Sequence, residues 1–166
     1  MKATEAKDSR LHGLIDLYDM HTGFFISALD GISDIHSHNR LNTKANHTAW
    51  LAGSLVQQRY EIASALTGES LKQAADALFK DNQGIKEDVT YPALEQYKQD
   101  WKKISPIARE ALVTATPEKL DSLIKIPGME MSLYELISFS IYREANCIGQ
   151  IALWRRLLGY DAMKYM

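Results

Sequence analysis

Five residues on two distant segments could carry chemistry. Near the C-terminus, Arg143 and Cys147 are four residues apart, so they share one face of a helix. In the first half of the chain, Ser54, Gln58 and Glu61 recur at helical spacing. Hydroxyl, amide, carboxylate and guanidinium groups can bind a polar ligand, and the thiol can act as a nucleophile or a metal ligand. The two segments therefore predict a binding site if the fold brings them together.

Three roles are open for Arg143, which lies in an apolar helical stripe where a guanidinium needs acceptors. It can pair inside the protein with Glu61 or Glu144. Gln58 and Ser54 would then be its further partners. It can instead extend to solvent, with Gln58 and Glu61 exposed. In the third interpretation it binds a small anionic ligand, such as a carboxylate or a phosphate.

Cys147 has two interpretations. Arg143 is one turn away and could favour the thiolate, which would make Cys147 a nucleophile. No histidine lies on that helical segment to act as a base, and a single buried cysteine commonly packs as a small apolar residue. Because it is the chain's one cysteine, it excludes an intramolecular disulfide and suits a reducing cytoplasm.

Periodic apolar residues predict the elements that must position these side chains. Gly68 is a stop signal for the second helix, and Ser132 with Glu135 forms a capping box for the last. Pro106 either kinks the third helix or restarts it. Short helices are expected after Ser70, which matches a capping box with Gln73, and from Thr116 to a stop at 126–128. No strand pattern of useful length is present. The four long helices are expected at about 9–29, 43–66, 92–115 and 132–158.

These patterns predict an all-α fold, a four-helix bundle with short accessory helices, in one domain over residues 1–166. Lysine plus arginine is 19 against 21 acidic residues, a net charge of −2, so no basic patch for nucleic acid is expected. No signal-peptide pattern and no membrane-spanning segment are present, which predicts a cytoplasmic protein with no membrane partner.

The last helical segment, REANCIGQIALWRRLLGY, resembles the last helix of the DinB-like (DinB/YfiT) metalloenzyme superfamily. In that family a histidine, three residues, a second histidine and one more position precede Gly-Gln-Ile, and arginines and a glycine follow. Here Gly149-Gln150-Ile151, Arg155-Arg156 and Gly159 match that pattern. The two histidine positions fall on Arg143 and Cys147.

The second helical segment is also similar to the family. In NHTAWLAGSLVQQRYEIASALTG, the residues Trp50, Gly53 and Leu55 match a family segment in which an apolar run with tryptophan leads into Gly-His-Leu. The position of the family's first metal-binding histidine is Ser54. With four long helices in the expected order, the resemblance extends over nearly the whole chain and implies the DinB/YfiT-like bundle.

The resemblance implies a divalent ion, such as zinc or nickel, held by three histidine nitrogens. In this chain Ser54 is a poor ligand, Arg143 would repel the ion, and Cys147 alone can coordinate strongly as a thiolate. His47 lies two turns before Ser54, about 10 Å along the axis, so it could reach the mouth of the pocket without replacing that ligand. We therefore expect a degenerate site with no metal and no cofactor.

Two functions follow from this sequence. The first is a small-molecule-binding or accessory protein whose pocket is formed by six candidate residues. The alternative is a metal- or cysteine-dependent thiol S-transferase or isomerase, as the resemblance implies for some members of the family. Whether the protein is an enzyme is therefore open, and a homodimer is expected with either function, because bundles of this family pair through helix faces. The candidate ligand-binding residues are Ser54, Arg143, Cys147, His47, Gln58 and Glu61.

Overall fold

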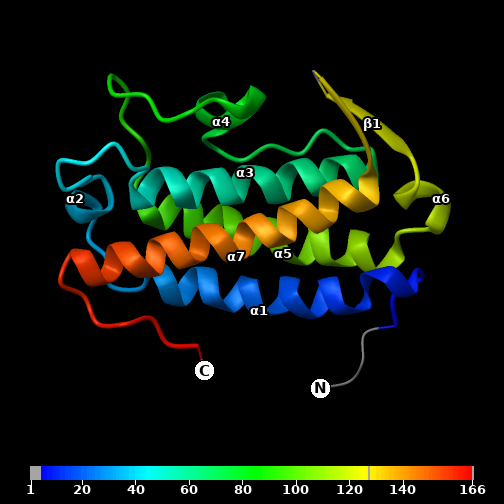
Figure 1. Ribbon diagram of the computed structural model, residues 1–166, viewed down its shortest axis with the longest axis horizontal. Coiled ribbons are helices and arrows are strands. Elements are labelled where there is room, and N and C mark those ends of the chain that lie inside the picture. Colours follow the sequence, from blue (N-terminus) through cyan, green and yellow to red (C-terminus); the bar gives the residue numbers. More distant parts are fainter. Residues whose placement is uncertain (1–4, 127, 166) are drawn as a thin grey trace.

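The computed structural model describes residues 5–126 and 128–165, and within these ranges four long helices form a bundle (Figure 1). This confirms the predicted all-α bundle with short accessory helices. The long helices are α1 (His12–Leu29), α3 (Thr48–Thr67), α5 (Leu94–Thr114) and α7 (Leu133–Leu157). The short elements are the 3-10 helices η1 (Ser9–Leu11) and η2 (Lys80–Asn82), the helices α2 (Asp34–Ser37), α4 (Asp76–Phe79) and α6 (Pro117–Leu120), and the strands β1 (Leu123–Ile126) and β2 (Met129–Ser132).

Each long helix contacts two others, in the cyclic order α1, α5, α3, α7. In Figure 1, α3 and α5 run in one direction while α1 and α7 run in the other. The connection from Gly68 to Ala93, which contains α4, therefore returns along the outside of the bundle. This topology places α3 beside α7, the two helices that carry the candidate site residues. None of the helices in the described ranges is both long and apolar enough to cross a membrane.

Local signals set both ends of α3 and the start of α7. Gly68 adopts φ 79° and ends α3, as predicted from the sequence. Ser132 and Glu135 form the predicted capping box of α7. The expected start of α3 at residue 43 is wrong, because His47 caps the helix by accepting a hydrogen bond from the Trp50 N–H at 3.0 Å.

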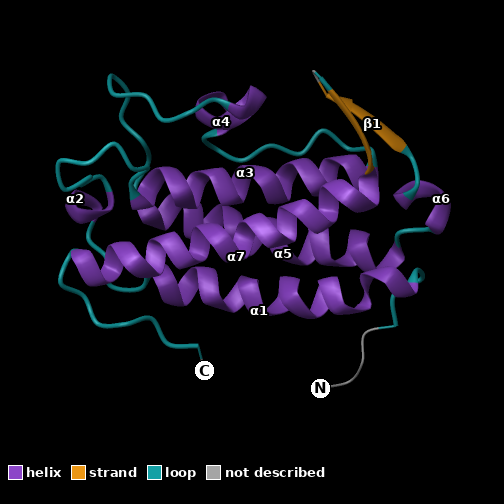
Figure 2. Ribbon diagram, viewed as in Figure 1, coloured by secondary structure: helices purple, strands orange, loops and turns teal. Residues whose placement is uncertain are grey.

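Three other sequence expectations are corrected. Ser70 does not cap a helix, since α4 begins at Asp76. The third helix begins at Leu94 instead of Pro92, and it continues through Pro106 as one helix. The segment after α6 forms an antiparallel hairpin of β1 and β2, coloured orange in Figure 2. Each strand has only four residues and is mostly exposed, so it leaves almost no apolar alternation to detect.

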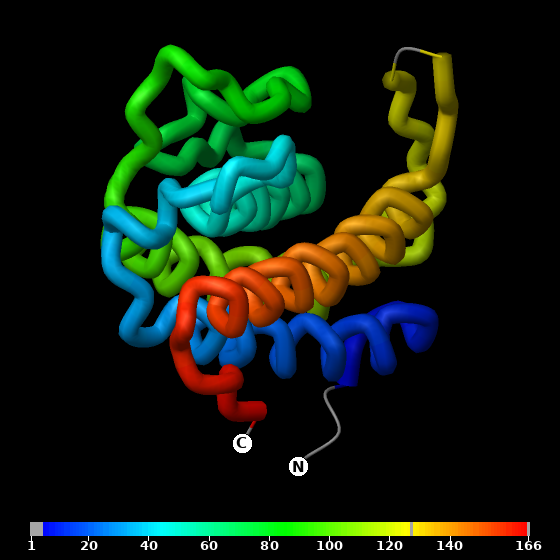
Figure 3. Tube along the Cα trace, turned by 60° about the vertical axis from the view of Figure 1, so that its left-hand side comes forward, coloured from blue at the N-terminus to red at the C-terminus, as the bar shows by residue number. Residues whose placement is uncertain are grey.

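The glycine at position 53 allows α4 to pack closely on α3. A Cβ atom at Gly53 would lie 2.2 Å from Cζ of Phe79 and 2.7 Å from Cε1 of Tyr97. Any larger residue would push Phe79 away, and with it the connection that covers one side of α3. In Figure 3 this connection and the β hairpin rise on the same side of the bundle. Gly53 thus positions one wall of the pocket described below.

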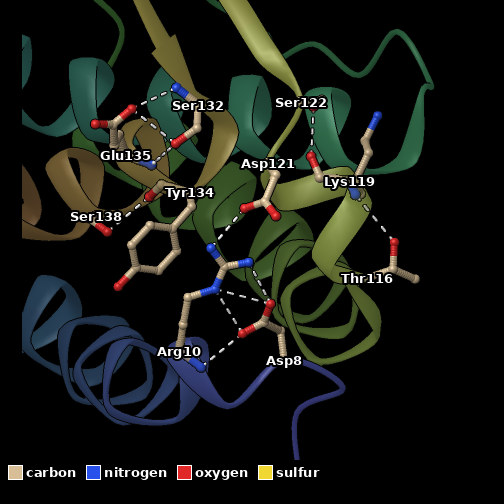
Figure 4. A network of polar contacts seen from close by, with 10 residues as sticks. All are labelled: Asp8, Arg10, Thr116, Lys119, Asp121, Ser122, Ser132, Tyr134, Glu135 and Ser138. Atoms are coloured by element: carbon tan, nitrogen blue, oxygen red, sulfur yellow. Dashed lines mark hydrogen bonds and ion pairs between the residues drawn. The ribbon is translucent and has the colours of Figure 1, made fainter.

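A partly buried polar network fastens the end of the bundle that carries the β hairpin (Figure 4). Arg10 donates to both carboxylate oxygens of Asp8, at 2.7 to 3.1 Å, and to Asp121 at 2.8 Å. Its guanidinium carbon lies 5.0 Å from the centre of the Tyr134 ring. The network joins the beginning of α1, the end of α6 and the beginning of α7.

Candidate functional site

A guanidinium bridges α7 to α3 at the centre of the candidate site. Nη2 of Arg143 donates to Oγ of Ser54 at 2.6 Å, and Nη1 donates to Oε1 of Gln58 at 2.7 Å. The structure therefore brings Arg143 together with two residues that lie 85 and 89 positions earlier in the chain. Arg143 and Ser54 are half-buried, whereas Gln58 is only 9% exposed.

These three residues line a pocket of about 210 Å³ between α3, α7 and the α4 connection. This is smaller than the roughly 300–1,000 Å³ of sites for drug-sized molecules, so the pocket suits a small ligand. Its walls combine aromatic and aliphatic side chains with several amides. The apolar lining consists of Trp50, Phe79, Leu136 and Phe139, and the polar lining of Ser54, Gln57, Gln58, Glu61, Asn82, Gln83, Ser140 and Arg143.

Several hydrogen-bond donors of the pocket have no acceptor. Nε2 of Gln58 and Nε1 of Trp50 are buried without a partner among the described residues. Arg143 has five N–H groups, and its two hydrogen bonds within the described ranges both go to neutral side chains. Since buried donors without acceptors cost free energy, the pocket favours a ligand that brings acceptor oxygens.

A second set of contacts fixes the acidic side of the pocket. Nε2 of Gln57 donates to Glu61 at 3.1 Å and to Asp76 at 3.0 Å. Oε1 of Gln57 accepts a hydrogen bond from Gln73 at 2.8 Å, which sets the orientation of its amide. Gln57 therefore holds two carboxylates close together, with Glu61 exposed on the pocket wall.

Two of the six candidate residues lie outside the pocket lining. His47 is 6% exposed, caps α3 and packs 5.2 Å from the His38 ring, and burial lowers its pKa to about 4. Cys147 is 4% exposed, and burial raises the pKa of its thiol although Arg143 acts in the opposite direction. The structure thus gathers Ser54, Gln58, Glu61 and Arg143 at the pocket. Their role in ligand binding stays a prediction.

Glu144 does not pair with Arg143, contrary to one of the sequence alternatives. It is 1% exposed and accepts two hydrogen bonds from Arg59, at 2.6 and 2.9 Å. Its Oε2 also lies 3.2 Å from Nδ1 of His21. Arg143 is one position earlier, about 100° round the helix, so the two side chains point to different neighbours.

Sequence reasoning missed Arg59, which is fully buried. Its guanidinium lies between the rings of Tyr18 and Trp101, 3.7 and 3.5 Å from their centres. All five of its N–H groups are used: two bind Glu144, and the others bind Thr22, Ser105 and the carbonyl oxygen of Tyr18. The spacing of Leu55, Arg59 and Ile62 on one helical face was the available signal.

The donor set of the pocket does not fit a divalent cation. The Oγ atom of Ser54 already accepts a hydrogen bond from the guanidinium of Arg143, whose positive charge would repel a divalent ion. Cys147, the one strong ligand at the three positions, does not line the pocket. In the described parts of the chain, no three histidine, cysteine, aspartate or glutamate side chains form a group that could hold a metal.

The fold has a counterpart among solved structures. No protein-family model and no curated protein matches the chain. The crystal structure of a DinB-like protein, YjoA, from Bacillus subtilis matches with a TM-score of 0.65. The match covers 92% of this chain and 96% of that protein at 15% sequence identity. At this identity the match establishes the architecture, and the chain therefore has the DinB-like fold.

Proposed function

We propose that the protein binds a small organic anion in the pocket between α3 and α7, without a metal ion. Arg143 holds the anionic group, while Ser54 and Gln58 orient the guanidinium and offer further donors. The observation that carries the proposal is that Arg143 forms no ion pair within the described residues, although its side chain is half-buried on the pocket wall. The aromatic and aliphatic wall would pack against the ligand's carbon skeleton.

Comparison with Arg59 strengthens this proposal. Arg59 is a structural guanidinium with full burial, five hydrogen bonds and a carboxylate partner, and the buried Arg155 is held by three hydrogen bonds to backbone carbonyl oxygens. Arg143 has two hydrogen bonds, and both acceptors are neutral. A guanidinium with free donors beside a cavity has the chemistry to bind a carboxylate or a phosphate in bidentate geometry.

The thiol-transfer alternative has less support. A thiol nucleophile needs exposure and a lowered pKa, whereas burial raises the pKa of Cys147. The three positions that hold histidines in the metalloenzymes are Ser54, Arg143 and Cys147, which do not suit a catalytic metal. We also propose that the protein forms a homodimer. Size-exclusion chromatography with light scattering can test this.

Binding can be tested by isothermal titration calorimetry with 3-phenylpropionate, an apolar carboxylate, and with its neutral amide. The wild-type protein should bind the acid and not the amide. Arg143→Met should abolish binding, whereas Arg156→Met, an exposed arginine on the same helix, should leave it unchanged. Equal affinity for acid and amide, or binding that survives Arg143→Met, would contradict the proposal.

Metal content is the companion measurement. Elemental mass spectrometry of the purified protein, before and after dialysis against zinc and nickel, should give a metal-to-protein ratio near zero. A ratio near one metal per chain would contradict the metal-free part of the proposal.

A further inference from the structure

We infer that the ligand of this pocket is a zwitterion with an apolar side chain, a small amino acid, whose ammonium group is bound by Glu61 while Arg143 binds its carboxylate. This inference rests on the proposed function and adds the class of ligand. It is based on two charged side chains of the pocket wall, Arg143 and Glu61, neither of which forms an ion pair among the described residues.

The donors and the carboxylate are ordered along α3. The guanidinium of Arg143 is hydrogen-bonded to Ser54 and Gln58, and Glu61 follows Gln58 by three residues, close to one turn. One turn corresponds to about 5 Å along the helix axis. Arg143 and Glu61 both line the pocket, so one small molecule can contact both, and their hydrogen bonds within the described residues go to other side chains.

Glu61 is held in place and still has free acceptor capacity. Its Oε1 accepts one hydrogen bond from Gln57, and no cation forms an ion pair with it among the described residues. Both N–H groups of the Gln57 amide are used, on Glu61 and Asp76, so the amide is fixed. A carboxylate fixed in this way by a buried amide is preorganised to accept from an ammonium group.

The surrounding charges also favour a cation beside Glu61. Desolvation raises the pKa of this carboxyl group, and the negative charges of Asp76 and Asp81 raise it further, while Gln57 and Arg143 lower it. An ammonium group would relieve this repulsion and stabilise the carboxylate. Asp76 is close by through Gln57, so this side of the pocket is locally negative although Arg143 is nearby.

A second observation supports a ligand in the same place. Gln58 is nine-tenths buried and lines the pocket, and its Nε2 has no acceptor in the described ranges. Since its Oε1 accepts from Arg143, this donor stands next to the guanidinium. The ligand's carboxylate can satisfy both groups, while its apolar side chain packs against the aromatic wall.

Three probes of nearly equal shape separate the charges: phenylalanine, 3-phenylpropionate, which lacks the ammonium group, and 2-phenylethylamine, which lacks the carboxylate. Titration calorimetry at pH 7 should show that phenylalanine binds about tenfold or more tightly than 3-phenylpropionate, as expected for one added charge-assisted contact. The amine alone should bind most weakly.

Glu61→Gln tests the assigned residue, because it removes the charge and keeps the shape. This variant should bind phenylalanine and 3-phenylpropionate equally, with the affinity for 3-phenylpropionate unchanged or improved. Glu118→Gln, an exposed control on α6, should keep the wild-type preference. Circular dichroism melting curves establish that each variant is folded.

The outcomes separate the two proposals. If 3-phenylpropionate binds through Arg143 and phenylalanine does not bind more tightly, the zwitterion inference is wrong and the anion-binding function stands. If phenylalanine is preferred and Glu61→Gln keeps that preference, Glu61 is not the ammonium-binding residue. If none of the three probes binds, both proposals fail for ligands with an apolar side chain.

Discussion

Replacing Glu144 by glutamine should destabilise the protein strongly, although the two side chains have nearly the same shape. The side chains of Glu144 and Arg59 are 2% and 0% exposed, and Arg59 donates two hydrogen bonds to Glu144. The substitution leaves Arg59 as a buried cation without a counter-charge. Breaking a buried ion pair by removing one partner costs about 3–5 kcal/mol in the free energy of unfolding.

The expected change in melting temperature follows from the size of the chain. In proteins of this size a loss of 1 kcal/mol lowers the melting temperature by about 2–4 °C. Glu144→Gln should therefore lower it by about 6–20 °C, measured by circular dichroism or calorimetry. Asp121→Asn is the matched control, because the Asp121 pair with Arg10 is exposed and should contribute less than about 1 kcal/mol.

The same network predicts a dependence on pH. Burial raises the pKa of Glu144, but the charge and hydrogen bonds of Arg59 and His21 lower it by more, so the net shift is downward. A carboxyl group with a lowered pKa in the folded state stabilises the fold above its unfolded-state value of about 4.5. That contribution is lost as the pH falls below this value and through the lower folded-state pKa.

Two results would refute this account of Glu144. One is a Glu144→Gln protein that unfolds within about 1 kcal/mol of the wild type, as the control should. The other concerns the double variant Arg59→Met/Glu144→Leu, which removes both charges. It should be more stable than Glu144→Gln alone, since no unpaired charge stays buried. A double variant that is less stable would show that packing, and not charge, dominates at this position.

Three further predictions concern residues outside the pocket. Because burial lowers the pKa of His47 to about 4, unfolding by urea should need less free energy as the pH falls from about 6.5 to 4. His47→Asn keeps a capping side chain and should lose this pH dependence. A variant whose free energy of unfolding changes with pH as in the wild type would contradict the assignment to His47. Cys147 should react with iodoacetamide far more slowly in the native protein than in denaturant, and equal rates would show that the thiol is accessible. Ser132→Ala should lower the free energy of unfolding by about 1 kcal/mol, because it removes the cap of α7. Ser138→Ala, which changes a serine inside the same helix, is the control, and urea unfolding measures both. A smaller loss for Ser132→Ala than for Ser138→Ala would show that the capping box contributes little.

Much of the fold could be predicted from the sequence because the long helices carry redundant signals. Capping residues such as Ser132 and stops such as Gly68 add to the apolar periodicity, and these local rules hold without knowledge of the neighbours. The start of α3 was missed because histidine is an uncommon cap, and only the structure shows Nδ1 of His47 at the Trp50 N–H. The β hairpin was missed because none of its eight strand residues is buried, so the strands have no apolar face that a sequence pattern could reveal.

The candidate site was less predictable, since it depends on how two helices turn towards each other. The sequence left open whether Arg143 pairs with Glu61 or Glu144, extends to solvent or binds a ligand. The answer depends on how α7 is rotated, because the side chains of Arg143 and Glu144 point about 100° apart around the helix. The structure puts Glu144 into the core against Arg59 and leaves Arg143 at the pocket. Cys147 likewise turns towards the core, where burial raises the pKa of its thiol.

We assign different roles to Arg59 and Arg143: Arg59 stabilises the fold, and Arg143 binds the ligand. Arg59 has a carboxylate and five hydrogen bonds, so a further anion would find no free donor there. Arg143 donates to two neutral acceptors, so its charge is not neutralised and its remaining N–H groups are available to a ligand. Arg155 is also buried without a carboxylate partner, but three backbone carbonyl oxygens accept its hydrogen bonds, whereas Arg143 has two side-chain acceptors and lines a pocket. The buried carboxylate of Glu144 pairs with Arg59 and not with Arg143. The positive charge of Arg143 therefore stays at the pocket, where a ligand can neutralise it.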